Sequence, residues 1–404
     1  FIFIYLTNIK YYIYYMEGGA LIKKNGIESD KYDGKKEDGH FGAKILATGS
    51  SSCIFRPNIP CKGDKKEGTD DKISKIVYGA KSDRYLKQEK KLNGIIQAIK
   101  GYGKWALIYD NFCKAPAYNN IFKYEKDIIK CMDEYYEDKF NETNNMMIGT
   151  YGGETFEDYF VDNILKHKSS KTIDKHMYIL FKKMEPLFIG LKTLYDNEIV
   201  HLDIKVNNIV IHEGNFKYID FGLSSKLSDK DHFEKRSSSE FDGRRIYLWY
   251  PMEYIYSYTT TGEKYKELLQ ININDKFRKH YDKGIKMQNI FEVDFKKHIK
   301  EILNNDDKIN HKELNSMIDT YSLGLLLPYL FVDYNRIKYI KSSKFLKDLF
   351  DFLGKMCEVD YKKRIKPVEC LKQYYILMKK YSSLEKGSSK LKKSKKKSKS
   401  RRRK

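Results

Sequence analysis

The sequence has no apolar run long enough to cross a membrane, since a transmembrane helix needs about 20 consecutive apolar residues. The opening stretch, residues 1–15, is apolar but shorter, and Lys10 interrupts it. It also lacks the basic segment and the small-residue cleavage site of a signal peptide. We expect no transmembrane segment, and we interpret residues 1–15 as upstream translation, with the working protein starting near Met16. A signal anchor is the alternative.

Cysteine is scarce, with six residues in 404, and none of them belongs to a C-x-x-C pair or a cluster with histidine. Structural zinc sites need such closely spaced ligands, so the pattern argues against zinc. Scattered cysteines in a chain of this length are more typical of free thiols in a reducing compartment than of a disulfide framework. We therefore expect free thiols at Cys53, Cys61, Cys113, Cys131, Cys357 and Cys370.

Acidic residues are too few to balance the basic ones, since 55 Asp and Glu face 77 Lys and Arg and leave a formal charge of +22. Much of the excess lies in residues 383–404, which have no apolar residue after Leu391 and cannot form a core alone. This basic tail is a nuclear localisation signal, a binding segment for nucleic acid or another polyanion, or a solubilising extension. We favour polyanion binding, which salt should weaken steeply. The tail has no aromatic residue for base stacking, which argues against sequence-specific recognition.

The rest of the chain is long enough for about two domains, and it is organised around residues 199–210. Two apolar runs there enclose a short polar segment, and a later apolar run ends at Asp220-Phe221-Gly222. The polar side chains of the first segment are His201, Asp203, Lys205 and Asn208. Two carboxylates and an amide at neighbouring strand ends predict a site that holds a divalent metal and an attacking hydroxyl together.

These two segments resemble the catalytic loop and the metal-binding D-F-G turn of the eukaryotic protein kinase superfamily, in that family's order and about a dozen residues apart. The resemblance implies an α+β, bilobal fold with a small, mainly β N-lobe and a larger, mainly α C-lobe. We expect a disordered leader at 1–41, the N-lobe at 42–150, the C-lobe at 151–382 with an insertion near 256–316, and the basic tail at 383–404.

The same resemblance assigns chemical roles to the central residues. Asp203 accepts or orients the proton of the acceptor hydroxyl, and Lys205 neutralises charge on the transferred phosphoryl group. Asn208 and Asp220 hold Mg²⁺, or Mn²⁺ in its place, because hard ions prefer oxygen ligands. Lys205 is typical of the serine/threonine type, although the Thr that such kinases usually keep before Trp249 is missing.

A second group of residues resembles the ATP-binding elements of the family. Residues 43–57 are typical of a strand, a small-residue turn and a strand, with Ala47, Gly49 and Ser52 at the positions that cover the ATP phosphates. Ile54 follows as the apolar cover of the adenine. An ordinary hairpin is the alternative.

The phosphate-binding lysine is assigned to Lys75 on the strand predicted at 72–78, with Lys72 as the second choice. Glu89, on the amphipathic helix that follows, is the expected ion-pair partner of this lysine. Farther along, a strand that runs into glycines at 149–151 resembles the hinge whose backbone binds the adenine edge.

Four further expectations concern the framework of the larger lobe. Apolar residues repeat at helical spacing over 176–197, which predicts one core helix leading to the catalytic loop. His201 is expected to be structural. By resemblance, Asp319 braces the catalytic-loop backbone, and Glu253 pairs with Arg364 in the interior.

One departure from the family pattern concerns regulation. Leu202 stands where the family has an Arg that binds a phosphorylated activation segment. Because Leu cannot bind phosphate, we predict that activity does not depend on phosphorylation of the serines that follow. These serines are Ser224, Ser225, Ser228, Ser237, Ser238 and Ser239.

The run at 49–57 and the central loop look most like kinases encoded by large nucleocytoplasmic DNA viruses. That resemblance implies protein substrates and a location in host cytoplasm or the virion, with the nucleus as an alternative because of the basic tail. Three other functions stay open: a pseudokinase scaffold, which Ala47 and Ser52 favour; a small-molecule phosphotransferase of related fold; and a nucleic-acid-binding protein acting through its tail.

Overall fold

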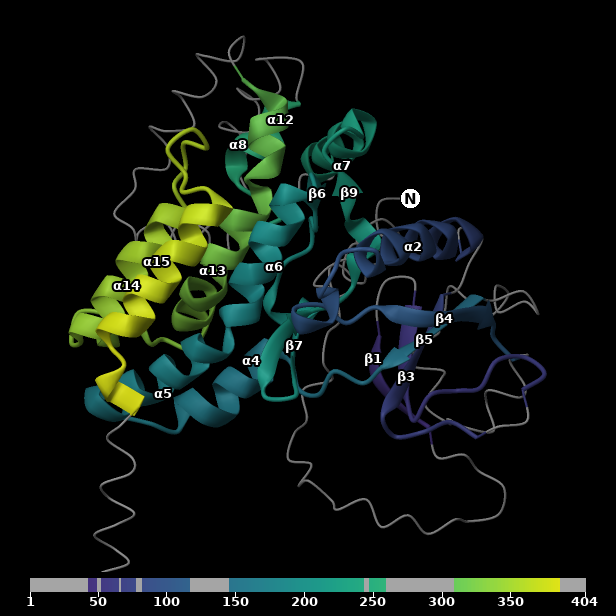
Figure 1. Ribbon diagram of the computed structural model, residues 1–404, viewed down its shortest axis with the longest axis horizontal. Helices are drawn as coiled ribbons and strands as arrows, with labels where there is room; N and C mark the ends of the chain where they lie inside the picture. Colours follow the sequence, from purple (N-terminus) through teal and green to yellow (C-terminus); the bar gives the residue numbers. More distant parts are fainter. Residues whose placement is uncertain are drawn as a thin grey trace, which may run out of the picture. The chain divides into compact units, whose positions relative to one another are not determined.

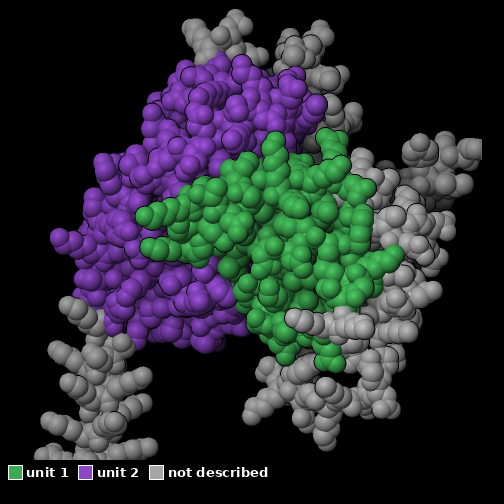
Figure 2. All heavy atoms as spheres, turned by 45° about the vertical axis from the view of Figure 1, so that its right-hand side comes forward, with its two compact units in different colours: residues 1–153 green, residues 154–404 purple. Residues whose placement is uncertain are grey.

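The structure is a computed structural model that describes seven stretches of the chain. They are residues 43–48, 52–64, 67–77, 82–116, 145–242, 247–258 and 309–385. The expected leader, Gly49, most of the expected insertion and the tail beyond residue 385 lie outside the described residues. The chain divides into two compact units, residues 1–153 and 154–404 (Figure 2).

The first unit contains a five-stranded antiparallel sheet with the strand order β1-β2-β3-β5-β4. The strands are β1 (Lys44–Thr48), β2 (Ser52–Arg56), β3 (Lys72–Val77), β4 (Tyr109–Lys114) and β5 (Asn145–Thr150). Side chains alternate between the two faces of a strand, and in β2 this alternation buries Cys53 and Phe55. These residues join Ile59, Ile76 and Met146 in one apolar core.

Helix α2 (Ser82–Gln97) packs against β3, β4 and β5 of the same unit. Leu92 and Ile96 form its buried apolar face. At its first turn the Asp83 carboxylate accepts a hydrogen bond from the Asn145 side chain at 2.6 Å and lies 3.3 Å from the Lys114 ammonium. This polar cluster ties the start of the helix to the ends of β4 and β5.

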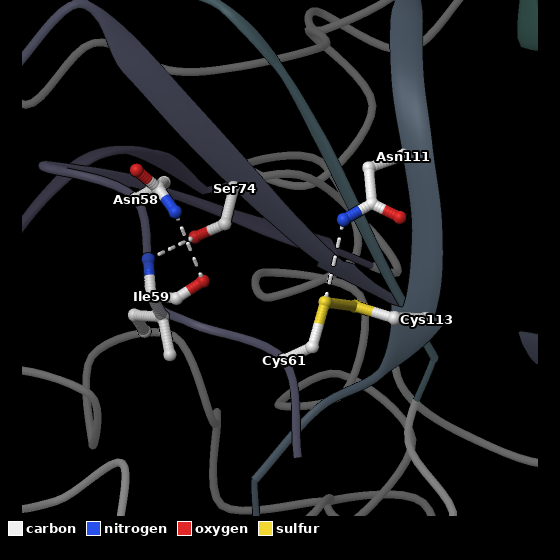
Figure 3. The surroundings of a disulfide bond; sticks show 6 residues. All are labelled: Asn58, Ile59, Cys61, Ser74, Asn111 and Cys113. Atoms are coloured by element: carbon white, nitrogen blue, oxygen red, sulfur yellow. Dashed lines mark hydrogen bonds between the residues drawn. A yellow bond between two sulfur atoms is a disulfide. The ribbon is translucent and has the colours of Figure 1, made fainter. Parts of the chain in front are cut away.

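The connection between β2 and β3 is fixed to the sheet by a disulfide, so the free-thiol prediction is wrong for Cys61 and Cys113. The Ile59 N–H donates to the Ser74 hydroxyl at 3.0 Å, and this contact lays the connection along β3 (Figure 3). Cys61 thereby reaches Cys113 on β4, 52 residues later in the chain.

The prediction also fails for Cys53, which is disulfide-bonded, while Cys131 lies outside the described residues. Cys357 and Cys370 are buried free thiols, as expected. Spacing along the chain does not reveal which cysteines meet, because the contact arises from the path of the folded loop.

Reduction of the Cys61–Cys113 bond should lower the free energy of unfolding. Chain-entropy reasoning for a loop of 52 residues gives about 4 kcal/mol as the upper end of the loss. Urea unfolding with and without reductant measures the change, and a variant with serine at both positions should respond less to reductant. Labelling of Cys61 and Cys113 by a thiol reagent in unfolded, unreduced protein would contradict the bond.

The second unit is mainly helical and is built around α13 (Ile318–Asp333), which is buried on nearly all sides. The other longer helices of this unit include α5 (Ser170–Lys183), α6 (Glu185–Asp196), α14 (Lys344–Met356) and α15 (Pro367–Lys380) (Figure 1). Helix α13 packs against α14, and α6 packs against α15. Gly324 permits the first contact, because a Cβ there would lie 2.8 Å from both Cys357 Sγ and Met356 Cβ.

Shorter elements complete this unit. The helices are α4 (Phe156–Phe160), α7 (Lys230–Asp242), α8 (Met252–Ser257) and α12 (His311–Ser316), and the strands are β6 (Ile199–Val200), β7 (Ile209–His212), β8 (Asn215–Tyr218) and β9 (Ser225–Lys226). The single helix predicted over 176–197 is instead two, α5 and α6, which meet at Met184. Pro186 in the first turn of α6 explains the break, because proline favours the start of a helix over its interior.

In the part of the chain that the structure describes, a small β unit that contains helix α2 and a larger helical unit confirm the predicted α+β class. Within the described ranges, no helix is both long and apolar enough to span a bilayer.

Candidate active site

The candidate site lies on two loops of the second unit that meet at one hairpin. Strands β7 and β8 pair so that Ile209 lies opposite Tyr218. A hydrogen bond of 3.0 Å from the Ile219 N–H to the Asn208 carbonyl continues the pairing at the open end. Asn208 and Asp220 therefore flank the same end of the hairpin, which brings the two predicted metal ligands to one place.

Asp203 lies on the loop between β6 and β7, and this residue is only 6% exposed. The Lys205 ammonium lies 3.2 Å from its Oδ1 and 3.0 Å from its Oδ2. The Asn208 side-chain amide donates to Oδ2 at 2.7 Å and to the Asp203 carbonyl at 2.9 Å. A cation and an amide thus fix the orientation of the carboxylate.

The backbone of this loop is held by a buried carboxylate, as predicted. Asp319, near the start of α13, accepts hydrogen bonds from the His201 N–H at 2.6 Å and the Leu202 N–H at 3.0 Å. Burial raises the pKa of Asp319 to about 7, and the two backbone donors partly offset this effect. Asp319 therefore holds the loop by two short hydrogen bonds, and its charge changes with pH near neutrality.

The raised pKa of Asp319 predicts a pH dependence of stability. When a carboxyl group keeps its proton to higher pH in the folded state, the free energy of unfolding falls as pH rises, here from about 4 to about 7. The reason is that ionisation of the carboxyl group costs more in the interior than in the unfolded chain. Compared with Asp319→Asn, the native chain should lose at most about 1.4 kcal/mol per pH unit in that window.

Urea unfolding at a series of pH values measures the Asp319 effect. The exposed carboxylate of Asp229 offers a matched control, and Asp229→Asn should keep the native slope. Parallel slopes for the native chain and Asp319→Asn would contradict the prediction.

His201 is buried and has the structural role that the sequence predicted. Its Nδ1 accepts from the Asp203 N–H at 3.3 Å, and its Nε2 lies 3.2 Å from the Ile219 carbonyl. One neutral tautomer, with the proton on Nε2, satisfies both contacts. Burial lowers the pKa of His201, which keeps this neutral form. The ring therefore links the loop of Asp203 to the turn at Asp220.

Two residues of the site have left-handed backbone conformations that side chains other than glycine seldom adopt. Leu202 and Asp220 both have φ of 62°. Such conformations persist where the surroundings determine them, and they concentrate at functional sites. At Leu202 the N–H is bound to Asp319, and the carbonyl accepts from the Tyr250 hydroxyl at 2.7 Å. The surrounding contacts thus hold the loop in a strained form.

The side chain of Leu202 lies in an apolar cluster with Phe233, Tyr250 and Tyr254. These partners come from α7, α8 and the segment before α8, so apolar packing fills the place that the family gives to an Arg. Several candidate phosphorylation serines are buried as well. Ser224 donates to the His201 carbonyl at 3.1 Å, and Ser237 donates to the Tyr254 carbonyl at 2.9 Å.

A serine/threonine phosphatase should therefore leave the activity of the purified protein unchanged. The apolar cluster around Leu202 needs no phosphate, and a phosphate on Ser224 or Ser237 would not fit a buried site. Activity before and after treatment, with phosphate content followed by mass spectrometry, tests this. A loss of most activity on treatment would contradict the prediction.

The first unit carries the residues predicted to bind ATP. Ala47 on β1 lies opposite Ile54 on β2, and Ser52 begins β2, so the two predicted strands are present and pair with each other. Gly49, in the turn, lies outside the described residues. The described flanks of the turn do not distinguish a phosphate loop from an ordinary hairpin.

Lys75 lies on the middle strand of the sheet, half-buried, with its ammonium 5.8 Å from the centre of the Tyr109 ring. The second choice, Lys72, forms an exposed ion pair with Asp110 at 3.3 Å, which favours Lys75 for the phosphate role. Glu89 is buried on α2, which packs against the strand of Lys75. The Lys75–Glu89 ion pair itself stays a prediction.

The predicted hinge, residues 149–151, lies at the end of β5. A Cβ on Gly149 would lie 3.1 Å from the Tyr109 ring and 3.2 Å from the Ile108 carbonyl, so a larger side chain there would displace its neighbours. Past this glycine, the Tyr151 N–H donates to the Asp71 carbonyl at 2.8 Å. That N–H already has an acceptor within the first unit.

One contact of the site was missed by sequence reasoning. The hydroxyl of Tyr247 donates a hydrogen bond to Oδ1 of Asp203. No motif marks Tyr247, which lies 44 residues after Asp203. The only sequence signal was the missing Thr before Trp249, which left open what fills that place.

The donor set fits a magnesium ion that arrives with a nucleotide. Among the described residues, no group of three or more His, Cys, Asp or Glu side chains is arranged to hold a metal. Protein-bound Mg²⁺ usually takes one or two carboxylates and completes its shell with substrate phosphates and water. Asp220 offers a carboxylate, and Asn208 offers its amide oxygen, because its amide nitrogen is already engaged by Asp203.

Comparison with known proteins gives a family model that includes both loops of the site, and several similar proteins. A family model described as "Protein kinase domain" matches residues 119–264. CTD kinase subunit alpha of Saccharomyces cerevisiae is 33% identical over 109 residues, which are 26% of this chain and 19% of that protein. Cyclin-dependent kinase C-1 of Oryza sativa is 38% identical over 81 residues, which are 20% of this chain and 14% of that protein.

Myosin-IIIa of Homo sapiens is 29% identical over 185 residues, which are 44% of this chain and 11% of that protein. The matched part therefore spans less than a fifth of the length of each of these three relatives.

Proposed function

We propose that this chain transfers the γ-phosphoryl group of ATP to Ser/Thr hydroxyls of proteins. It has the fold of a protein kinase domain, and its matches support the eukaryotic protein kinase superfamily. The observation that carries the proposal is the Asp203 carboxylate, fixed by Lys205 and Asn208 on a strained loop. A scaffold without catalysis has no need of this arrangement.

In the proposed reaction, Asp203 orients the acceptor hydroxyl and takes its proton through Oδ1, since Asn208 engages the other oxygen. The Lys205 ammonium, 3.0 Å from Asp203, neutralises charge on the transferred group. When bound with ATP, Mg²⁺ or Mn²⁺ at Asn208 and Asp220 would supply positive charge to the phosphate oxygens. His201 and Asp319 hold these groups in register and take no part in the transfer.

The serine/threonine acceptor type rests on Lys205 and on the similarity to proteins named as kinases. The competing proposal is a pseudokinase, because Ala47 and Ser52 replace two glycines of the phosphate loop. Both residues are small, so close approach of a phosphate remains compatible with them. The viral type, the location in host cytoplasm, virion or nucleus, and polyanion binding by the tail stay predictions from the sequence.

Transfer of labelled γ-phosphate from ATP and Mg²⁺ to generic basic and acidic proteins tests the proposal. Asp203→Asn and Asp220→Asn are run in parallel, and the labelled acceptor residues are identified. Labelling of Ser or Thr that both substitutions abolish would support the proposal. Labelling that persists in both variants would point to a contaminating kinase, and no transfer by the native chain would favour the pseudokinase.

A further inference from the structure

Two segments that lie far apart in the sequence form one basic surface on the second unit. The first segment, residues 166–175, contains the start of α5, and the second, residues 336–347, contains the start of α14 (Figure 1). We call this surface the basic face. Its charged residues, apart from Asp174, are Lys166, Lys168, Lys171, Lys175, Arg336, Lys338, Lys341, Lys344 and Lys347.

Hydrogen bonds hold the two segments side by side. The Arg336 guanidinium donates to the carbonyls of Leu165 and His167. The Tyr339 hydroxyl donates to the Lys168 carbonyl at 3.2 Å. Each of these contacts joins residues that are 169 or 171 positions apart in the sequence. Because side chains of the second segment bind the backbone of the first, the lysines of both segments belong to one surface.

The charge of the basic face is not neutralised by the residues that the structure describes. Every lysine of the face except Lys175 is exposed. Within the described ranges, no carboxylate forms an ion pair with any of these lysines. The carboxylate of the face itself, Asp174, is half-buried and is bound by the Ser343 side chain. One negative charge therefore stands against eight lysines and an arginine.

The starts of two helices add to the positive potential of this face. Helices α5 and α14 follow the capping serines Ser169 and Ser343, and neither helix has an acidic residue in its first turn. Lys171 and Lys344 lie there instead. The positive end of a helix favours carboxylates and repels ammonium groups, so this arrangement costs stability. A bound anion would relieve the repulsion at both helix starts.

An exposed apolar side chain lies within the basic face. Ile337 begins the short helix Ile337–Tyr339 and is 38% exposed, with Arg336 and Lys338 on either side of it in the sequence. Lysines around an apolar residue are typical of surfaces that lie on anionic membranes. Single-stranded nucleic acid would favour free aromatic rings for base stacking. The Tyr339 ring already has Arg336 and Lys338 at 5.6 and 5.4 Å from its centre.

We propose that the basic face docks the chain on a membrane surface rich in anionic phospholipids. The lysines contact the anionic head groups, and Ile337 enters the boundary between head groups and acyl chains. The contact is peripheral and reversible, and it needs no helix that spans the bilayer. The inference goes beyond the proposed function and does not depend on it, because docking needs neither ATP nor catalysis.

Co-sedimentation of the full chain with phosphatidylcholine vesicles that contain about a third phosphatidylserine measures the docking. We expect binding to these vesicles that weakens as salt is raised, and no binding to pure phosphatidylcholine vesicles. Each basic residue near an anionic surface strengthens binding about fivefold, so loss of four lysines should weaken it about 10²–10³-fold. The four substitutions, combined in one variant, are Lys168→Gln, Lys171→Gln, Lys338→Gln and Lys341→Gln.

A control variant with the same net charge removes four exposed lysines elsewhere in the second unit. Its substitutions are Lys226→Gln, Lys230→Gln, Lys235→Gln and Lys362→Gln. This variant should bind the vesicles nearly as the native chain does, and urea unfolding checks that both variants fold. Equal weakening in the two variants would show an effect of overall charge and overturn the proposal. Unchanged binding in both would assign the binding to the basic tail and would overturn it as well.

The variant Ile337→Ser distinguishes a membrane from a nucleic acid. Loss of the apolar contact should weaken vesicle binding about threefold to tenfold and leave binding to a single-stranded oligonucleotide unchanged. Val368 on α15 is 42% exposed, and Val368→Ser should bind vesicles as the native chain does. Vesicle binding that does not respond to Ile337→Ser, together with tighter oligonucleotide binding that the four-lysine variant loses, would overturn the membrane assignment in favour of nucleic acid.

Discussion

Asp203→Asn should reduce kcat by about 10²–10⁴-fold, the usual cost of losing a general base. The substitution keeps the size of the side chain and an oxygen for Lys205 to contact, but an amide cannot take the acceptor proton. Nucleotide affinity should not change, because the predicted phosphate and metal ligands are other residues. The effect therefore belongs in kcat rather than in the KM for ATP.

Steady-state kinetics with ATP and a labelled protein acceptor, together with direct nucleotide binding, measure the Asp203 effect. Asp220→Asn provides the informative contrast, since loss of a metal-ligand carboxylate should weaken metal-dependent nucleotide binding as well as transfer. Asp229→Asn removes an exposed carboxylate of the same unit and should leave kcat unchanged. A normal kcat in Asp203→Asn would remove the general-base assignment and with it the main support for catalysis.

The features that the sequence predicted well are those carried by local spacing. The loop from His201 to Asn208 and the turn at Asp220 each lie in a few consecutive residues, and the hairpin between them is short. Apolar runs on both sides fix their place in the fold, so the chemistry can be read before the structure is known. The α+β class was implied by the family resemblance that these two segments carry.

Contacts between distant segments were predicted only where the family resemblance supplied them. The family resemblance predicted the role of Asp319, which accepts a hydrogen bond from the His201 N–H across 118 residues of sequence. The Cys61–Cys113 bond and the Tyr247–Asp203 contact had no such guide, and both depend on how a connecting segment folds back. The spacing of apolar residues predicts which face of a helix or strand is buried, but it does not predict which residues that face contacts.

The break between α5 and α6 shows a different limit. Apolar residues continue at helical spacing across Met184, so the pattern by itself favours one helix. Pro186, two residues after Met184, decides the outcome, because proline has no backbone N–H to donate in a helix interior. A local stereochemical rule therefore outweighed the periodic signal.

Breaking the ion pair between Glu253 and Arg364 should have the largest effect on stability. The Arg364 and Glu253 side chains are 0% and 3% exposed, and the guanidinium also donates to the Glu358 carbonyl at 2.8 Å. Removal of one partner from a buried pair leaves an uncompensated charge in the interior and costs about 3–5 kcal/mol. Glu253→Leu and Arg364→Met should each lose that much in urea unfolding.

The double variant separates the charge effect from lost packing. With both side chains replaced, no uncompensated charge remains, so the loss should be clearly smaller than the sum of the two single losses. The exposed pair of Lys312 and Glu198, at 2.6 Å with side chains 65% and 57% exposed, is the matched control. Lys312→Met should cost no more than about 1 kcal/mol, because solvent screens such pairs. Single losses as small as this control, or a double loss equal to the sum, would show that the buried pair does not hold α8 to the rest of the helical unit.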